Sequence, residues 1–245
     1  MAVELVYGLH AVRSLLTRKP ETVLELWIQQ GRDDDSLRTL ASLACNAGIA
    51  VQTVGRKTID KRCPDATHQG VLARCRRQCN QAPDLGGFVD SLDSSSIILV
   101  LDAVQDPRNL GACLRSADAA GVAGVVTSKN RSAPLSPAAR KAAAGAAETV
   151  QVIEVSNLAR ALETLSAAGV TVIGTAGDAA LSLFEQAFET PVAFVLGGEE
   201  KGLRRLTRER CDALVRIPMY GSVESLNVSV ATGICLFEGR RRLYG

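Results

Sequence analysis

The stretch IPMYGSVESLNVSVA, residues 217–231, gives the clearest indication of how the chain folds. The β-prone residues 213–217 lead into it and end at a proline, which predicts a strand followed by a small polar loop. No charged side chain occurs in residues 225–237, and apolar residues recur there at helical spacing. We therefore expect a final helix that begins near Ser225 and is buried on most sides. Ser225 and Asn227 would lie in its first turn, where backbone N–H groups need partners, so they either cap the helix or serve a site.

The composition is that of a folded protein rather than a disordered one. Hydrophobic residues make up 47% of the 245 residues and charged residues 22%, enough for one large domain or two ordinary ones. Aromatic residues are only 4%, which disfavours RNA binding by base stacking on interleaved aromatic side chains. No apolar run is long enough to span a bilayer and no signal peptide is recognisable, so we expect a soluble, cytoplasmic protein.

Basic residues are concentrated in the first third of the chain. Residues 1–82 contain twelve Lys and Arg against eight Asp and Glu, whereas the rest contains sixteen against eighteen. This surplus favours an anionic partner such as nucleic acid over a membrane for the front part, although a solubilising surface would look similar.

The cysteines and histidines do not predict a metal site. The chain has two histidines, His10 and His68, and no Cys-x-x-Cys pair. Its seven cysteines are Cys45, Cys63, Cys75, Cys79, Cys113, Cys211 and Cys235. We expect them to be free thiols packed as small hydrophobic side chains in a reducing compartment.

The first part of the chain has the pattern of a small α/β domain over residues 1–77. We expect helices at 8–18 and 36–46, a helical turn at 58–62, and strands at 23–28, 49–54 and 69–75. Residues 78–93 are expected to form a linker that contains a polar segment and then a short helix, 85–92.

Residues 94–245 alternate strands and helices, which predicts a mostly parallel sheet covered by helices on both faces. Strands are expected at 97–101, 122–127, 150–155, 170–176, 192–196 and 213–217. Helices are expected at 110–120, 137–147, 158–168 and 206–211, with a short helical piece at 181–187. Ligands of such sheets bind beyond the carboxyl ends of the strands.

Two further polar clusters follow strands of this sheet. In the first, DAVQDPRNLG at 102–111, Asn109 is a candidate helix cap, and Arg115 lies in the helix behind it, where it could form a surface salt bridge. In the second, LGGEEKGL at 196–203, paired glycines allow either a close approach to a ligand or a tight turn. This is not a P-loop, and GTAG at 174–177 lacks the spacing of a dinucleotide-binding fingerprint, which argues against a nicotinamide-dependent oxidoreductase.

Taken in order, the three clusters resemble the motifs of SpoU-type RNA ribose 2′-O-methyltransferases. The matching residues are NLG at 109–111 with Arg115, LGGE at 196–199 with GL at 202–203, and IPM at 217–219 with SLNVSVA at 225–231. In the front domain, YGLHAV at 7–12 and HQG at 68–70 resemble the RNA-binding extension of these enzymes. With RSADAAG at 115–121 and NLAR at 157–160, nearly the whole chain resembles the 23S rRNA guanosine 2′-O-methyltransferases of bacteria.

The resemblance implies a fold, a cofactor and partners. The C-terminal segment would be threaded into a trefoil knot that binds S-adenosylmethionine, two chains would form a homodimer through the knot domain, and the front domain would bind 23S rRNA. The cofactor contacts would be Thr175, Leu196, Gly197, Gly198, Ile217, Met219 and Leu226. The catalytic residues would be Asn109, Arg115, Glu199, Ser225 and Asn227.

The resemblance also suggests how the catalytic residues divide the work. A guanidinium is a poor proton acceptor, so we expect Arg115 to orient the target phosphate and stabilise the forming alkoxide. Asn109 would position Arg115 or the ribose, and Glu199 would hold its loop or Arg115. Ser225 and Asn227 would order the last loop.

This sequence departs from the family pattern at Glu224 and at residues 200–201 (EK), which leaves details of the target open. A tRNA ribose methyltransferase of the same fold and a non-catalytic rRNA-binding assembly factor remain as alternatives.

Overall fold

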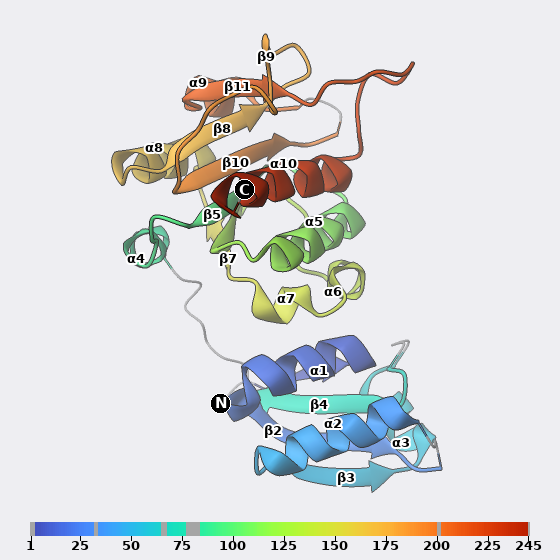
Figure 1. The fold of residues 1–245 in the computed structure, drawn as a ribbon. Coiled ribbons are helices and arrows are strands. Elements are labelled where there is room, and N and C mark those ends of the chain that lie inside the picture. The colour runs from blue at the N-terminus through green and yellow to red at the C-terminus, as the bar shows by residue number, and fades with distance from the viewer. Residues whose placement is uncertain (1–2, 32–33, 65–67, 77–83, 200–201, 245) are drawn as a thin grey trace. The chain divides into compact units, whose positions relative to one another are not determined.

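The computed structural model describes the chain except for residues 1–2, 32–33, 65–67, 77–83, 200–201 and 245. Most of the polar part of the predicted linker and both residues of the departure at 200–201 therefore lie outside the described residues. The chain divides into two compact units, Met1–Asn80 with Ala144–Thr149, and Gln81–Ala143 with Val150–Gly245 (Figure 1). No helix in the described ranges is long and apolar enough to cross a membrane.

The first unit is built on a four-stranded sheet in the order β1-β4-β2-β3. Its strands are β1 (Val3–Tyr7), β2 (Val23–Gln29), β3 (Ala50–Val54) and β4 (Val71–Arg76), with β4 antiparallel to both neighbours and β2 parallel to β3. Strand β1 was not predicted from the sequence. It is an edge strand in which only Val6 is buried, so it has no continuous apolar pattern.

Helices cover both faces of this small sheet. Helices α1 (Leu9–Arg18) and α2 (Asp35–Asn46) pack with Leu26, Ala73 and other buried residues in one core. Helix α3 (Arg56–Arg62) contributes Ile59 to a second cluster with the alternate strand residues Trp27 and Leu72. A 3₁₀ turn, η1 (Pro20–Thr22), joins α1 to β2.

The two motifs of the front domain meet in the structure. The side-chain oxygen Oε1 of Gln69 accepts a hydrogen bond from the backbone N–H of Leu9 (3.2 Å). His68 is buried, and its Nδ1 accepts from the N–H of Gly70 (3.0 Å) while its Nε2 lies 2.8 Å from Oδ1 of Asp60. Because Nδ1 accepts, Nε2 carries the proton and donates to Asp60, so this imidazole fixes the loop before β4.

The second unit contains a seven-stranded parallel sheet in the order β7-β6-β5-β10-β8-β11-β9. The strands are β5 (Ile97–Asp102), β6 (Gly124–Ser128), β7 (Val152–Val155), β8 (Thr171–Thr175), β9 (Leu181–Ser182), β10 (Val192–Gly197) and β11 (Ala213–Arg216). Strand β5 is buried over its whole length, as is typical of a strand covered on both faces. The predicted parallel α/β sheet is therefore confirmed.

Helices lie on both faces of the large sheet (Figure 1). Helices α5 (Pro107–Ala120) and α10 (Val228–Tyr244) pack against each other on one face. On the other face, α4 (Leu85–Asp90) and α8 (Leu158–Ala167) share a core with the strands. The shorter helices of this unit are α6 (Pro137–Ala143) and α9 (Arg205–Glu209). Helix α7 (Ala146–Thr149) belongs to the first unit.

Three sequence-based expectations about helices were wrong. The segment expected to be one helix at 137–147 is broken by Ala144 and Gly145, both with positive φ, into α6 and α7. Residues 181–187 form the short strand β9 and a turn, because Leu181 pairs with Val215 of β11. The final helix begins at Val228, not near Ser225.

The final helix is also less buried than expected. Val230 and Phe237 are about half exposed, at 50% and 52%, whereas Val228, Cys235 and Leu236 are buried. One side of α10 therefore packs on the sheet and on α5, and another side leaves apolar residues open to solvent in the single chain.

Candidate active site

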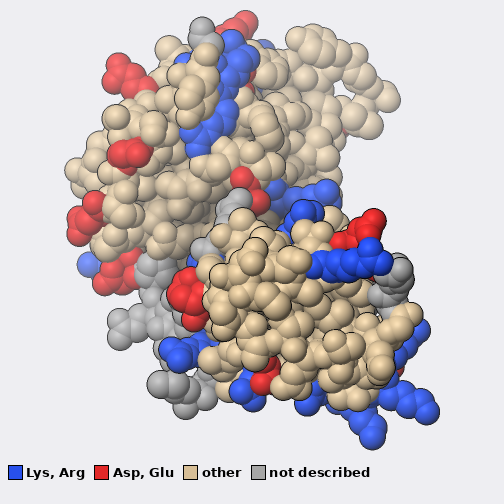
Figure 2. All heavy atoms as spheres, turned by 60° about the horizontal axis from the view of Figure 1, so that its bottom comes forward, with Lys and Arg blue, Asp and Glu red and all other residues tan. Residues whose placement is uncertain are grey.

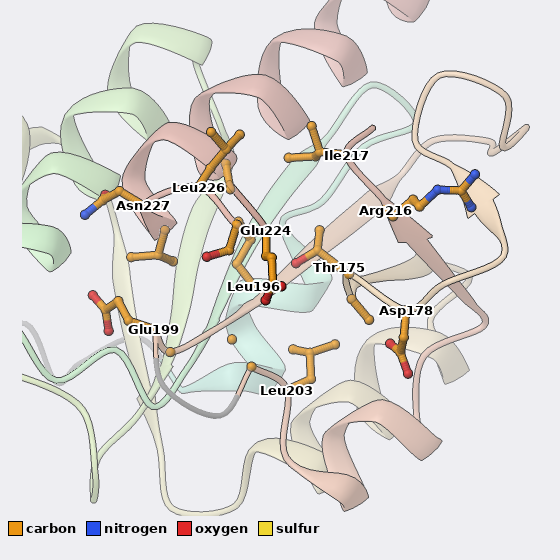
Figure 3. A pocket seen from close by; sticks show the side chains of 18 of the residues that line it. Thr175, Asp178, Leu196, Glu199, Leu203, Arg216, Ile217, Glu224, Leu226 and Asn227 are labelled. Atoms are coloured by element: carbon orange, nitrogen blue, oxygen red, sulfur yellow. The ribbon is translucent and has the colours of Figure 1, made fainter. Parts of the chain in front are cut away.

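A cleft of about 940 Å³ opens at the carboxyl ends of β8, β10 and β11 (Figure 3). This volume lies at the upper end of the range of small-molecule sites. All seven residues predicted to contact a cofactor line it: Thr175, Leu196, Gly197, Gly198, Ile217, Met219 and Leu226. They come from the end of β8, from the end of β10 with the residue that follows it, and from the loop after β11, which the parallel sheet brings to one edge.

The paired glycines of the second cluster serve packing between backbone segments. A side chain at Gly198 would lie 2.5 Å from the carbonyl oxygen of Ala103, and one at Gly197 would collide with the backbone of Gly202. The N–H of Gly198 donates to the carbonyl of Asp102 (2.9 Å), and that of Gly202 donates to Gly198 (3.0 Å). The loop is therefore folded tightly onto the end of β5, and its backbone forms one wall of the cleft.

Asn109, Glu199 and Asn227, one from each cluster, form a continuous hydrogen-bonded chain. The Nδ2 of Asn227 donates to Oδ1 of Asn109 (3.0 Å), and Nδ2 of Asn109 donates to Oε1 of Glu199. The direction is set at Asn227, whose Oδ1 accepts from the N–H and the hydroxyl of Ser229 at 2.9 and 2.6 Å. Glu199 and Asn227 line the cleft, and Figure 3 shows them on the same side of it.

Asn109 is not the helix cap that the sequence suggested. Asp106 caps α5 by accepting from the N–H of Arg108 (2.7 Å), and Pro107 takes the first helical position. Asn109 lies in the first turn of the helix, which frees its amide to join Glu199 to Asn227. Asn227, by contrast, does occupy the start of α10, where its carbonyl accepts from the N–H of Ala231 (3.0 Å).

The two remaining predicted catalytic residues are placed differently. Ser225 lines the cleft from the loop before α10 and is exposed. Arg115 lies six residues beyond Asn109 on α5, is exposed, and does not line the cleft. It has no hydrogen bond or ion pair within the part of the chain that the structure describes. A single chain therefore brings together Asn109, Glu199, Ser225 and Asn227 but leaves Arg115 apart from them.

The structure adds a buried ion pair that the sequence did not reveal. Asp102, at the end of β5, is fully buried, and its Oδ1 accepts from Nε of Arg204 (2.5 Å) while Oδ2 accepts from the N–H of the same residue (2.9 Å). These two hydrogen bonds tie the far end of the 198–204 loop to the sheet. An aspartate that ends the apolar run IILVL was the only sequence signal, and its partner is 102 residues away.

A second ion pair borders the opposite side of the cleft. Asp178 and Arg208 form two parallel hydrogen bonds of 2.9 Å each. The hydrogen bond from Arg208 lowers the pKa of the Asp178 carboxyl below its usual value. Arg216, also in the cleft wall, donates to the carbonyls of Ala179 and Ala180.

Glu224 is the remaining charged residue among the described ones that line the cleft. It is exposed, and it has no hydrogen-bond or ion-pair partner within the described ranges. Figure 3 shows its side chain near that of Leu196. The departure from the family pattern at this position therefore places an unpaired carboxylate in the cleft itself.

The thiol nearest the polar chain is held in its neutral form. Cys113 is buried in α5, and its Sγ lies 3.3 Å from the hydroxyl of Thr232 in α10. Burial raises its pKa to about 11, helped by the charge of Glu199 and opposed by the hydrogen bond to Thr232. In the described residues, no group of three His, Cys, Asp or Glu side chains could hold a metal ion.

Comparison with known proteins identifies the family. The model of the SpoU rRNA Methylase family matches residues 96–237, which is more than half of the chain. The chain belongs to this family. A second model, described as RNA 2′-O ribose methyltransferase substrate binding, matches residues 5–79. Both matches include the motifs on which the sequence-based resemblance rested.

SpoU-family relatives match over almost the full length of the chain. This chain is 47% identical over 243 residues to the 23S rRNA (guanosine-2′-O-)-methyltransferase RlmB of Pectobacterium atrosepticum, and the match covers 99% of each of the two chains. Among solved structures, an AdoMet-bound rRNA methyltransferase from Sinorhizobium meliloti has a TM-score of 0.77 and 27% identity, covering 98% of this chain and 88% of the other. An RNA 2′-O ribose methyltransferase with a TM-score of 0.79, covering 99% of this chain and 90% of the other, shares the fold at 24% identity.

Proposed function

We propose that this protein transfers a methyl group from S-adenosylmethionine to the ribose 2′-hydroxyl of a guanosine in 23S rRNA. The observation that carries the proposal is the chain of hydrogen bonds from Asn227 through Asn109 to Glu199, which joins all three family motifs beside the cleft. The 47% identity to an RlmB methyltransferase over 99% of both chains supports the same substrate.

The cleft fits S-adenosylmethionine, which, when bound, supplies a methyl group on a positively charged sulfur. Leu196, Ile217 and Leu226 offer apolar contacts, while the backbone of the Gly197–Gly198 turn offers polar groups. The hydroxyl of Thr175 donates to the carbonyl of Val195 (3.2 Å), so this residue would contact the cofactor through its other atoms. Met219 completes the same set of contacts from the last loop.

The protein's main contribution to the reaction is positioning. Holding two reactants in line can supply at best about 7–11 kcal/mol of the barrier reduction. The ribose would lie at the rim where Asn109, Glu199, Ser225 and Asn227 gather, and the asparagine amides would orient it. Glu199 accepts a hydrogen bond from Nδ2 of Asn109. This bond fixes the Asn109 amide in the orientation that leaves its oxygen facing Asn227.

Arg115 would act as a fixed cation on the RNA. A guanidinium does not lose its proton at physiological pH, so the proton of the 2′-hydroxyl must leave through the phosphate or water. Arg115 would orient the target phosphate and stabilise the negative charge that develops on the ribose oxygen.

The active enzyme would be a homodimer in which each chain has two domains. Residues 1–77 would bind 23S rRNA, residues 78–93 would link, and residues 94–245 would carry the cofactor site in a trefoil knot. Lys and Arg side chains gather along the rim of the first unit (Figure 2), which agrees with its surplus of positive charge. The half-exposed Val230 and Phe237 on α10 support a homodimer through the knot domain. The site of action of such an enzyme is the cytoplasm, during ribosome biogenesis.

Methyl transfer from tritiated S-adenosylmethionine tests the proposal. The substrates are 23S rRNA from a strain that lacks its own enzyme and, in parallel, bulk tRNA. We expect label on one 23S guanosine, located by the alkaline resistance of its 3′ phosphodiester, and its loss in Arg115→Ala. Label on tRNA alone would assign the protein to the tRNA-modifying branch of the fold. RNA binding without any label would be compatible with the fold but would contradict the proposed methyltransferase activity.

A further inference from the structure

A second hollow, of about 520 Å³, lies at the carboxyl ends of β6 and β7. It is formed by three segments, 128–131, 156–159 and 204–207. We call it the basic hollow, because, of the residues that the structure describes, its charged lining residues are Arg131, Arg204 and Arg205 and none is acidic. The motif NLAR at 157–160 contributes part of the lining, but neither the proposed catalytic residues nor the predicted cofactor contacts account for the three arginines.

The three arginines differ in how far they are already engaged. Arg204 is bound to Asp102 inside the protein, with about a third of its side chain exposed. Arg205 pairs with Glu209 (2.8 Å), but both side chains are exposed, at 79% and 52%, so the pair is weak. Arg131 is exposed and has no hydrogen bond or ion pair within the described part of the chain.

The backbone at Arg131 supports a purpose beyond packing. Its φ of 78° lies in the left-handed region, which costs a residue with a side chain free energy that glycine would avoid. The preceding Asn130 also lines the hollow. An unpaired guanidinium on a strained turn is the pattern expected of a group that binds a ligand.

The basic hollow and the cofactor cleft share one loop. Gly198, Glu199 and Leu203 line the cleft, and Arg204 and Arg205, which follow directly, line the hollow. Adjacent residues have Cα atoms about 3.8 Å apart, so the two cavities are immediate neighbours at the same edge of the sheet. Both open where the strands end, and Asp102 fixes the shared loop between them through Arg204.

We propose that the basic hollow binds a backbone phosphate of the substrate RNA beside the target nucleotide. The inference rests on the proposed function and adds to it a place where the strand is held. Guanidinium groups bind phosphate oxygens through parallel hydrogen bonds. Arg131 supplies such donors, and so does Arg205 beside its weak pair with Glu209, while none of the described lining residues is acidic. With the target ribose at the rim of the cleft, the RNA strand would continue across the shared loop to the hollow.

The test compares Arg131→Ala and Arg205→Ala with Arg210→Ala in the full chain. Arg210 is a matched control, because it pairs with Glu163 (2.9 Å), is half exposed and lies outside both cavities. The measurements are binding of 23S rRNA from a strain lacking its own enzyme across a salt series, KM for that RNA, kcat, and affinity for S-adenosylmethionine by calorimetry.

In Arg131→Ala, we expect RNA binding to weaken and KM for RNA to rise by about tenfold, with kcat within about twofold. The slope of log affinity against log salt should fall by about 0.7–0.9, the value for one lost phosphate contact. Arg205→Ala should change in the same direction by less, Arg131→Lys should recover most of the binding, and Arg210→Ala should match the wild type. Cofactor affinity should stay unchanged throughout.

Unchanged RNA affinity and salt slope in both hollow variants, with the wild type methylating 23S rRNA, would overturn this inference and leave the proposed function intact. Weaker cofactor binding in Arg131→Ala would also overturn it, because the residue would then act through the shared loop. A wild type that binds 23S rRNA but does not methylate it would instead contradict the proposed function.

Discussion

The two edges of the seven-stranded sheet use polar side chains in opposite ways. At the amino edge, charged groups form hydrogen bonds within the fold. Asp93 accepts hydrogen bonds from Ser95 and Ser96, and Arg240 donates to the carbonyls of Ala120 and Gly121. At the carboxyl edge, Ser225, Glu224 and Arg131 face cavities with no hydrogen-bond partner among the described residues. The amino edge uses these groups to fix the chain, whereas the carboxyl edge, beside anchoring pairs such as Asp102 with Arg204, also keeps groups available for ligands.

This difference follows from the topology. In a parallel sheet every strand leaves at the same edge, so the loops that follow the strands converge there, and helices return the chain to the other edge. Helix α10 shows both ends of this arrangement. Its start holds Asn227 at the cleft, and near its other end Glu238 binds Arg241 and Arg242. Substitutions at the carboxyl edge should therefore change activity, with or without a loss of stability, and those at the amino edge should change stability alone.

The largest effect is expected from Asn109→Ala. It removes the link between Glu199 and Asn227, and kcat should fall by about 10²–10³-fold, the usual loss when a positioned donor is removed from an active site. Asn109→Asp should be at least as damaging, because its carboxylate would face that of Glu199. The melting temperature should change little in the alanine variant, because Asn109 is not the cap of α5.

Single-turnover rates and thermal melts check this expectation. If Asn109→Ala kept more than about a tenth of the wild-type kcat, the hydrogen-bonded chain would be structural, and the contrast between the two edges would fail there.

The next effect separates two aspartates that bind backbone groups at opposite edges. Asp102→Asn disrupts the two hydrogen bonds to Arg204 and should cost about 2–3 kcal/mol of stability, the penalty for leaving buried polar groups unpaired. It should also weaken cofactor binding, because the loop that it anchors forms a wall of the cleft. Asp212→Asn removes a bond to the N–H of Val172 (2.7 Å) at the amino edge and should leave cofactor binding unchanged.

Calorimetric titration with S-adenosylhomocysteine and thermal melts on both variants distinguish the two edges. Equal losses of ligand affinity in Asp102→Asn and Asp212→Asn would mean that loop anchoring is not specific to the carboxyl edge.

Much of this arrangement could be predicted from the sequence, because local patterns carry it. An uninterrupted apolar run such as residues 97–101 indicates a strand buried on both faces, and the three polar clusters each follow such a strand. The cap of α5 was also within reach, since Pro107 at the first helical position points to Asp106 rather than Asn109.

Other features depend on contacts that no local pattern contains. The partner of Asp102 is 102 residues away, and β9 exists only because two residues pair with β11. The charge-free sequence of α10 predicted burial on most sides, yet Val230 and Phe237 are half exposed. An apolar helix face can be covered by its own sheet or by another chain, and a single sequence does not distinguish the two.

A smaller effect is expected at the amino edge from Glu238→Gln. The hydrogen bond from Arg241, and then that from Arg242, lowers the pKa of the buried Glu238 carboxyl below its ordinary 4.5. A carboxyl with a lowered pKa in the folded state stabilises the protein above pH 4.5 and loses that contribution as the pH falls through its folded value. At pH 7 the variant should be less stable by about 1–2 kcal/mol, and the gap should narrow below pH 4.5.

Thermal melts from pH 7 to pH 3.5, with Glu163→Gln as the control for an exposed pair, measure this gap. Methyl transfer at pH 7, below the melting temperature, should be close to that of the wild type. A pH-independent gap would contradict the stabilising role of the Glu238 carboxylate, and a large loss of activity in folded Glu238→Gln would place function at the amino edge as well.

The smallest effect concerns Glu224, the unpaired carboxylate in the cleft. S-adenosylmethionine carries a positive sulfur that S-adenosylhomocysteine lacks, so a nearby carboxylate should favour the first over the second. In Glu224→Ser, affinity for S-adenosylmethionine should fall by about two- to fivefold, the range of an exposed charge interaction, while affinity for S-adenosylhomocysteine stays the same. The difference should shrink at high salt, because exposed charges are screened. Calorimetry with both ligands at two salt concentrations measures it, and an equal change for the two would mean that Glu224 acts by shape rather than by charge.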